Sequence, residues 1–201
     1  MTNDSPRGSF WLPVGLAVVA ILLRAAKAFD LDWLPNVSPW MALAFAGTAL
    51  FPRRLSWWLI PGVMLGLDAL VQPGVLRAAP GTMLAVYGCL AVAAFFGGRL
   101  RRSGVSVLAV LLGTLACSLL FYGVMNTVSW ASEPAYARSL AGWWQAQTLG
   151  LPGYPPSWTF LRNALLGDAA FAGLLVLARQ AEALLRHLPL LQWAPRSAAT
   201  A

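Results

Sequence analysis

Charged residues are scarce in this sequence, and acidic residues are the scarcest of them. The 201 residues include only 7 Asp or Glu and 14 Lys or Arg, so 10% are charged and 59% are hydrophobic. A soluble domain has roughly 25% charged residues. Because only lipid can cover so much apolar surface, we expect one integral membrane domain over residues 1–188 and a short cytoplasmic tail over 189–201. The expected partner is then the lipid bilayer. Although the net charge is +7, no nucleic-acid partner is expected.

Other scarcities exclude several classes of catalyst. The only histidine, His187, follows the last apolar segment, so a histidine-based triad or a zinc site is not expected. There is no glycine-rich phosphate-binding loop of the Walker type, so the chain cannot use ATP to drive transport by itself. Cys89 and Cys117 both lie in apolar segments, where we do not expect a structural disulfide. No nucleophile–base pair is apparent, which argues against an intramembrane enzyme.

Six apolar segments have the length of membrane helices or of parts of them. They cover residues 10–29, 39–51, 56–71, 82–98, 104–127 and 158–185. A helix needs about 20 apolar residues to cross the hydrocarbon core of a bilayer. The second and third segments are shorter than this and are joined by Pro52-Arg53-Arg54-Leu55, so they fit either two spans or one bent hairpin. We predict an all-α membrane protein, a bundle of six transmembrane helices.

The charged residues divide unequally between the connections. Nine cations and two acids lie before the first segment, between the second and third, between the fourth and fifth, and at or after the end of the sixth. The cations are Arg7, Arg53, Arg54, Arg99, Arg101, Arg102, Arg179, Arg186 and Arg196, and the acids are Asp4 and Glu182. The remaining charges sum to zero. Because cationic loops stay in the cytoplasm, six crossings predict that both termini are cytoplasmic and that residues 30–38, 72–81 and 128–157 are outside.

The last outer loop is unusually long and aromatic. Residues 129–157 include three tryptophans and two tyrosines, a composition that argues against disorder. We expect a short surface helix over residues 135–148. Six of the ten tryptophans fall towards the outer side. An aromatic belt at the membrane interface explains part of this pattern, and a large, flat, partly apolar ligand held by the outer loops would explain the imbalance.

Polar side chains inside the apolar segments are a sharper signal, because ionisable groups in a bilayer usually face a cavity or a partner. They are Arg24, Lys27, Asp68, Asn126, Arg162, Asn163 and Asp168, all in the predicted outer half or near the midplane. Two interpretations remain open: salt bridges that serve stability alone, such as Asp168 with Arg24, or the floor and wall of an outward-facing pocket. Cys89, in the fourth segment, is either a small buried side chain or a soft thiolate ligand for a metal centre.

Three short stretches resemble a known family. Pro35-Asn36-Val37-Ser38-Pro39, Asn126-Thr127-Val128-Ser129-Trp130 and the stretch from Leu161 to Asp168 are similar to small bacterial membrane proteins that resemble the substrate-binding S-components of energy-coupling-factor (ECF) transporters. The cysteine of the fourth segment resembles that of the BtuM-type proteins, solitary vitamin B12 transporters within this group. The resemblance implies a six-helix bundle, multi-pass in the bacterial inner membrane, with a substrate pocket closed by the outer loops.

The resemblance also implies a ligand chemistry. Cobalamin would be the cargo and Cys89 the axial ligand of its cobalt, and an ECF coupling module is a partner that the sequence neither requires nor excludes. The substrate-binding candidates are Asp68, Tyr87, Asn126, Trp130, Tyr136, Arg162, Asn163 and Asp168. A thiolate below the cobalt would displace the benzimidazole base and weaken the bond to the upper ligand, so bound cyanocobalamin could lose cyanide. Two alternatives stay open: uptake of another small molecule with Cys89 merely packed, and a structural protein without a ligand.

Overall fold

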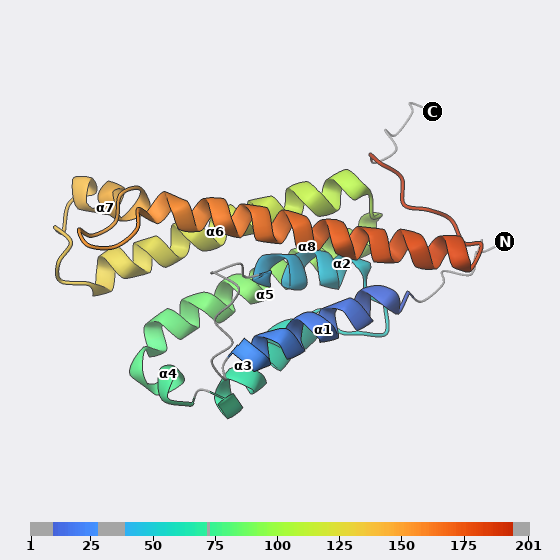
Figure 1. Ribbon diagram of the computed structural model, residues 1–201, viewed down its shortest axis with the longest axis horizontal. Coiled ribbons are helices and arrows are strands. Elements are labelled where there is room, and N and C mark those ends of the chain that lie inside the picture. The colour runs from blue at the N-terminus through green and yellow to red at the C-terminus, as the bar shows by residue number, and fades with distance from the viewer. Residues whose placement is uncertain (1–9, 28–38, 72, 195–201) are drawn as a thin grey trace.

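The computed structural model describes residues 10–27, 39–71 and 73–194, and its regular structure in these ranges is helical (Figure 1). In chain order the helices are α1 (Leu12–Lys27), the π-helix η1 (Ala42–Gly47), α2 (Thr48–Leu50), α3 (Leu59–Val71), α4 (Pro73–Ala78), α5 (Pro80–Ser103), α6 (Val107–Ser132), α7 (Leu140–Gln147) and α8 (Ser157–Leu185). The only β-type pairing within the described ranges is an isolated bridge between Ser106 and Gln192. The prediction of an all-α chain is confirmed.

Three helices, α5, α6 and α8, are long and apolar enough to cross a membrane. They have 24, 26 and 29 residues. At 1.5 Å per residue these lengths correspond to about 36–44 Å, which exceeds the roughly 30 Å of hydrocarbon in a bilayer. Local sequence fixes where two of them start. Proline occupies the first turn of α5, where no amide donor is needed, and Ser106 caps α6 by accepting a hydrogen bond from the amide of Ala109.

The second apolar segment forms the buried centre of the bundle. Every residue from 41 to 50 is buried, and the segment is helical from residue 40 through η1 and α2. Eleven helical residues rise about 16 Å, roughly half the hydrocarbon thickness. Neighbouring helices approach it closely through glycine: a Cβ at Gly97 would overlap the carbonyl of Phe45, and one at Gly113 would overlap the Phe45 ring. Protein therefore surrounds this segment on all sides.

Two shorter apolar helices, α1 and α3, flank this centre. The turn between α2 and α3, residues 51–58, is held by Arg101 at the end of α5. The Arg101 guanidinium donates to the carbonyl oxygens of Phe51, Pro52 and Leu55, at 3.5, 3.0 and 3.0 Å. This ties the short hairpin to one of the long helices.

One end of the bundle collects the start of α1, the turn 51–58, the end of α5 and the end of α8; we call it the arginine end. Residues 189–193, predicted as part of a cytoplasmic tail, are packed here. The amides of Val107 and Leu108 donate to the carbonyl oxygens of Gln192 and Trp193, both at 2.9 Å. Hydropathy alone predicted a tail here. It could not predict that this stretch pairs with the amides at the start of α6, which have no partner within their own helix. Residues 195–201 lie outside the described part.

Candidate functional site

The centre of the bundle contains a buried carboxyl group. Asp168, in α8, accepts a hydrogen bond from the amide of Ala42 at 2.9 Å and another from the hydroxyl of Ser118 at 2.6 Å. Both Asp168 and Ser118 are buried. The carboxyl group thus links α6 and α8 to the first turn of η1. The salt bridge considered between Asp168 and Arg24 lies outside the described side chains.

Both cysteines lie in the same region, as free, buried thiols. Cys89, in α5, is only 6% exposed. Cys117, in α6, directly precedes Ser118 and lies near both Cys89 and Asp168. Among the described residues there is no group of three or more His, Cys, Asp or Glu side chains arranged to hold a metal ion.

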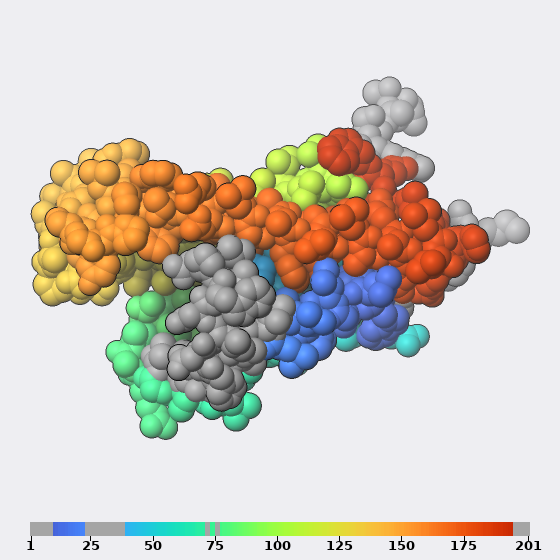
Figure 2. All heavy atoms as spheres, in the orientation of Figure 1, coloured from blue at the N-terminus to red at the C-terminus, as the bar shows by residue number. Residues whose placement is uncertain are grey.

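In each of the three long helices, the run of buried residues ends near the two cysteines and Asp168. None of residues 80–88 of α5, 119–132 of α6 and 158–166 of α8 is buried, whereas Cys89, Cys117 and Asp168 all are. Figures 1 and 2 show α4 with the first turns of α5 as a first lobe, and α6 and α8 projecting together with α7 as a second lobe. We call the layer of Cys89, Cys117, Ser118 and Asp168, at which these runs of buried residues end, the closed layer.

A tyrosine–carboxylate pair joins the first lobe to α3. The Tyr87 hydroxyl donates to Asp68 Oδ2 at 2.6 Å, which joins α5 to α3 two residues before Cys89. Both side chains are half-buried. Two of the predicted site residues are therefore in direct contact, on the side of the closed layer where α5 has no buried residues.

The second lobe is built around Thr127. Its hydroxyl oxygen accepts from Trp143 Nε1 at 3.0 Å and from Gln147 Nε2 at 3.1 Å, which fastens α7 to α6. The Tyr122 hydroxyl adds a short hydrogen bond to the carbonyl of Gln147. The predicted surface helix over residues 135–148 is present in its second half, as α7. It is capped by Ser139, whose hydroxyl accepts from the amide of Gly142 at 3.2 Å.

The other candidates lie along this lobe but do not converge on one point. Asn126 donates to the carbonyl of Tyr122 in its own helix. Trp130 donates to the carbonyl of Ala137, and Tyr136 is buried in the same loop. Arg162 donates to the side chain of Asn163, 3.3 Å away, and stacks on the Trp158 ring. The nine predicted site residues thus fall into the closed layer, the Tyr87–Asp68 pair and the lobe of α6–α8.

Comparison with known proteins gives one match. A family model covers residues 4–189, nearly the whole chain. The chain belongs to DUF6580, a family of unknown function. No curated protein and no solved structure matches the chain.

Sequence reasoning missed several residues that organise this DUF6580 chain. Ser118 was passed over because a serine inside an apolar helix commonly bonds to its own backbone, and its Oγ is indeed 3.0 Å from the carbonyl of Thr114. Glu182 was counted only as a charge, although it accepts from the amides of Trp11 and Leu12. Its partners are 171 and 170 residues away, a separation that no local pattern reveals.

Proposed function

We propose that the protein is a multi-pass protein of the bacterial inner membrane with six spans and both termini in the cytoplasm. The gathering of arginines supports this topology. Arg53, Arg54, Arg101 and Arg179 line one cavity at the arginine end, while α7 and the long aromatic loop lie at the other end (Figure 1). Cationic segments are retained in the cytoplasm, so the arginine end would face inward and α7 outward. In this arrangement α1 and α3 are tilted or short spans, and the buried segment of η1 and α2 pairs with α3.

We further propose that the protein binds cobalamin and takes it up across this membrane. The observation that carries the proposal is the position of Cys89 in the closed layer, next to the stretches of α5, α6 and α8 that have no buried residues. A flat corrin ring entering between the lobes from the α7 side would reach the thiol of Cys89 at the end of its path. One protein ligand is sufficient for cobalt, because the corrin ring supplies four nitrogen ligands of its own.

Polar groups along the proposed path fit the corrin periphery. Cobalamin carries amide side chains around the ring, which need hydrogen-bond donors and acceptors. Tyr87 and Asp68 lie on one lobe, and Asn126, Arg162 and Asn163 lie on the other. Trp130, near the end of α6, and Tyr136, in the loop that follows, would close the pocket from outside. Asp168 would act as part of the floor, since both of its oxygens are already bonded within the protein.

Binding through Cys89 would also change the upper ligand of the cobalt. The thiol gives up its proton and the thiolate replaces the benzimidazole base below the ring. Cyanide leaves the upper face with the electron pair of its bond to cobalt and takes up the proton as hydrogen cyanide. Cobalt keeps its oxidation state, so neither an oxidant nor a reductant is needed. The proposed side activity is a ligand exchange that accompanies uptake.

The absorption spectrum of the purified protein with added cyanocobalamin tests the assignment. We expect wild-type protein to shift the visible bands of the cofactor and to release cyanide, and Cys89→Ala to do neither. Cys117→Ala is the matched control, since it removes the same group from the same layer and should keep the spectral change. If the Cys89→Ala spectrum equals that of wild type, the ligand assignment is wrong.

The alternatives give different results in the same preparations. Protein purified from cells grown with vitamin B12 should be red if cobalamin is the cargo. A transporter of another small molecule would be colourless and would show no rise in melting temperature with cyanocobalamin. Uptake by cells that lack any ECF coupling module would show whether the chain acts alone, because its sequence has no phosphate-binding loop with which to use ATP.

A further inference from the structure

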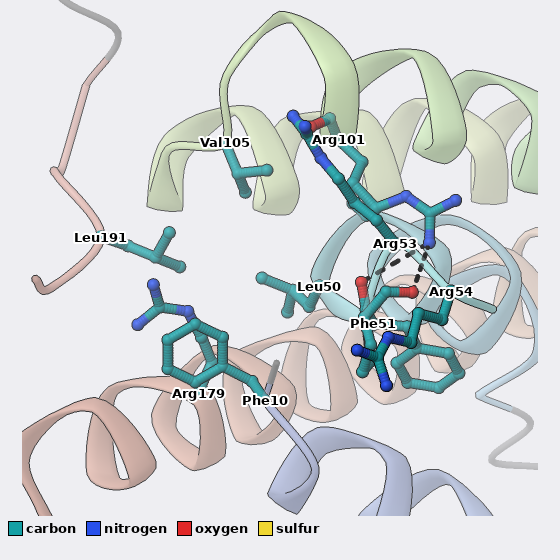
Figure 3. A pocket seen from close by; sticks show the side chains of 11 residues that line it. Phe10, Leu50, Phe51, Arg53, Arg54, Arg101, Val105, Arg179 and Leu191 are labelled. Atoms are coloured by element: carbon teal, nitrogen blue, oxygen red, sulfur yellow. Dashed lines mark hydrogen bonds between the residues drawn. The ribbon is translucent and has the colours of Figure 1, made fainter. Parts of the chain in front are cut away.

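The arginine end contains a cavity of about 420 Å³ that is separate from the proposed cobalamin site (Figure 3). Its walls come from six places in the sequence: Phe10, residues 49–54, Arg101 at the end of α5, Val105, Arg179 of α8 and the packed residue Leu191. Arg53, Arg54, Arg101 and Arg179 all line it. Four cations around one cavity are unusual, because like charges repel unless an anion separates them.

Among the residues that the structure describes, no carboxylate lines this cavity. The acid nearest to Arg179 in the sequence of α8 is Glu182. Its carboxylate accepts from the amides of Trp11 and Leu12 at 2.6 and 2.7 Å, and it forms a salt bridge with Arg186 at 2.9 Å. In the part of the chain that the structure describes, none of the four cavity arginines forms a salt bridge with a carboxylate. Glu182 lies near enough to Arg179 to attract its guanidinium group, but Arg53, Arg54 and Arg101 have no carboxylate partner among the described residues.

Two of the four guanidinium groups are held in place. Arg101 is fixed by the carbonyl oxygens of the turn 51–55, and Arg179 donates to the carbonyl of Pro189 at 3.3 and 3.2 Å. The Arg179 guanidinium also lies 3.4 Å from the centroid of the Phe10 ring. Figure 3 shows these two side chains entering the cavity from α5 and α8. Held groups lose little conformational entropy on binding, so the cavity is preorganised for an anion.

We propose that this cavity binds a phosphate group. Guanidinium groups match phosphate oxygens in geometry and charge, and several arginines can share one phosphate. Apolar side chains, among them Phe51, Val105 and Leu191, line the cavity beside the arginines. This mixture of charge and apolar surface suits the headgroup of an anionic phospholipid, in which a phosphate is joined to a hydrocarbon part. Free inorganic phosphate presents the same anion without that part.

The test compares the two sources on the full-length protein in a neutral detergent. Dioleoyl phosphatidylglycerol is titrated in mixed micelles, with dioleoyl phosphatidylcholine as the uncharged counterpart. Sodium phosphate is titrated separately against sodium chloride of the same ionic strength. The readouts are the melting temperature, followed by tryptophan fluorescence, and the lipid retained in native mass spectra. We expect phosphatidylglycerol or phosphate to raise the melting temperature and their counterparts to leave it unchanged.

The variants separate a site from general charge attraction. Arg53→Gln/Arg54→Gln removes two cavity charges from exposed side chains, and Arg99→Gln/Arg102→Gln removes two charges from exposed side chains that do not line the cavity. At about 1 kcal/mol for each arginine, the first pair should weaken binding by roughly 30-fold, while the second pair should retain it. A response to phosphatidylglycerol alone identifies a lipid headgroup, and a response to phosphate alone identifies the free anion.

The proposal is wrong if neither anion raises the melting temperature, or if the two double variants lose binding equally. Val105→Glu guards against a folding defect in the arginine variants. It places a carboxylate among the four arginines, so we expect the anion-dependent shift to disappear while the protein without added anion melts no lower than wild type. An unchanged anion response in Val105→Glu would also overturn the proposal.

Discussion

Ser118 of α6 donates a hydrogen bond to the carboxyl group of Asp168 of α8, with 2.6 Å between the two oxygens. The other oxygen of Asp168 accepts from the amide of Ala42. This amide belongs to the first turn of η1, where helix amides lack partners within the helix. One buried carboxyl group therefore satisfies a backbone donor and a side-chain donor, and joins three helical segments.

Removing this carboxyl group should destabilise the fold. We expect Asp168→Ala to lower the free energy of unfolding by about 3 kcal/mol, because the Ala42 amide loses its acceptor in a buried place. Ser118→Ala should lower it by about 1 kcal/mol, since the amide bond remains. Unfolding in mixed micelles containing sodium dodecyl sulfate, followed by tryptophan fluorescence, measures both. Asn163→Ala, also in α8, is the control and should stay within about 0.5 kcal/mol of wild type.

Two glycines of α5 should respond in opposite directions to alanine. A Cβ at Gly97 would overlap the backbone carbonyl of Phe45, which cannot move without shifting the buried centre. We expect Gly97→Ala to lower the free energy of unfolding by about 2–3 kcal/mol. At Gly88 nothing lies within 4 Å of the added Cβ, so Gly88→Ala should raise it by up to about 1 kcal/mol through helix propensity. Equal effects at the two positions would show that close packing against Phe45 does not limit this helix.

The long helices could be predicted because their apolar runs are unbroken. The predicted segment 158–185 and helix α8, Ser157–Leu185, nearly coincide. The full burial of residues 41–50 could not be predicted from hydropathy, because a lipid-facing side chain and a protein-facing one are equally apolar. The alanine and glycine content of this segment was the available signal. Small residues in this segment let other helices approach on every side. Gly97 of α5 and Gly113 of α6 allow the same close approach from the neighbouring helices, against Phe45.

The candidate site was predicted one residue at a time, and its contacts were not. Sequence position alone placed Tyr87 and Asp68 in different segments, and only the packing of α5 on α3 brings them to 2.6 Å. Cys89 and Cys117 were interpreted separately for the same reason. The arginines were predicted to share one side from the charge of the loops, but that argument contains no information on distance. It could not predict that Arg53, Arg54, Arg101 and Arg179 would line a single cavity.

The carboxylate of Glu182 should control the start of α1. It accepts from the first two amides of that segment and is 2.9 Å from Arg186. A carboxylate at a helix start satisfies free amides and interacts well with the helix dipole. We expect Glu182→Ala to lower the free energy of unfolding by about 2 kcal/mol and to speed amide exchange in the first turn of α1. Glu182→Gln keeps the acceptor and loses only a partly exposed ion pair, so its effect should stay below about 1 kcal/mol.

Amide exchange also provides the control for Glu182. Glu133→Ala removes an exposed carboxylate that bonds only the nearby amide of Ala135. Exchange in α1 should then match wild type. If Glu182→Ala leaves α1 as protected as wild type, packing of α1 on α8 is sufficient and the cap is not needed.

Thr127 should decide how firmly α7 is held. Its hydroxyl oxygen is the acceptor for both Trp143 and Gln147, and valine has the same shape without that oxygen. Thr127→Val leaves Trp143 Nε1 without its acceptor and Gln147 Nε2 with only the carbonyl of Gly123. It should loosen α7 by about 1–2 kcal/mol, which speeds its amide exchange roughly tenfold. Thr148→Val is the matched control, because that hydroxyl bonds only the carbonyl of Trp144 in α7 itself.

The Thr127→Val variant also tests the proposed function. If α7 covers cobalamin bound between the lobes, loosening it should raise the dissociation constant for cyanocobalamin without removing the spectral change that depends on Cys89. A Thr127→Val protein that binds cobalamin as tightly as wild type, although α7 exchanges faster, would show that α7 does not contribute to the pocket. Because Thr127 is in α6 and Cys89 is in α5, the two substitutions separate closure of the site from ligation of the cobalt.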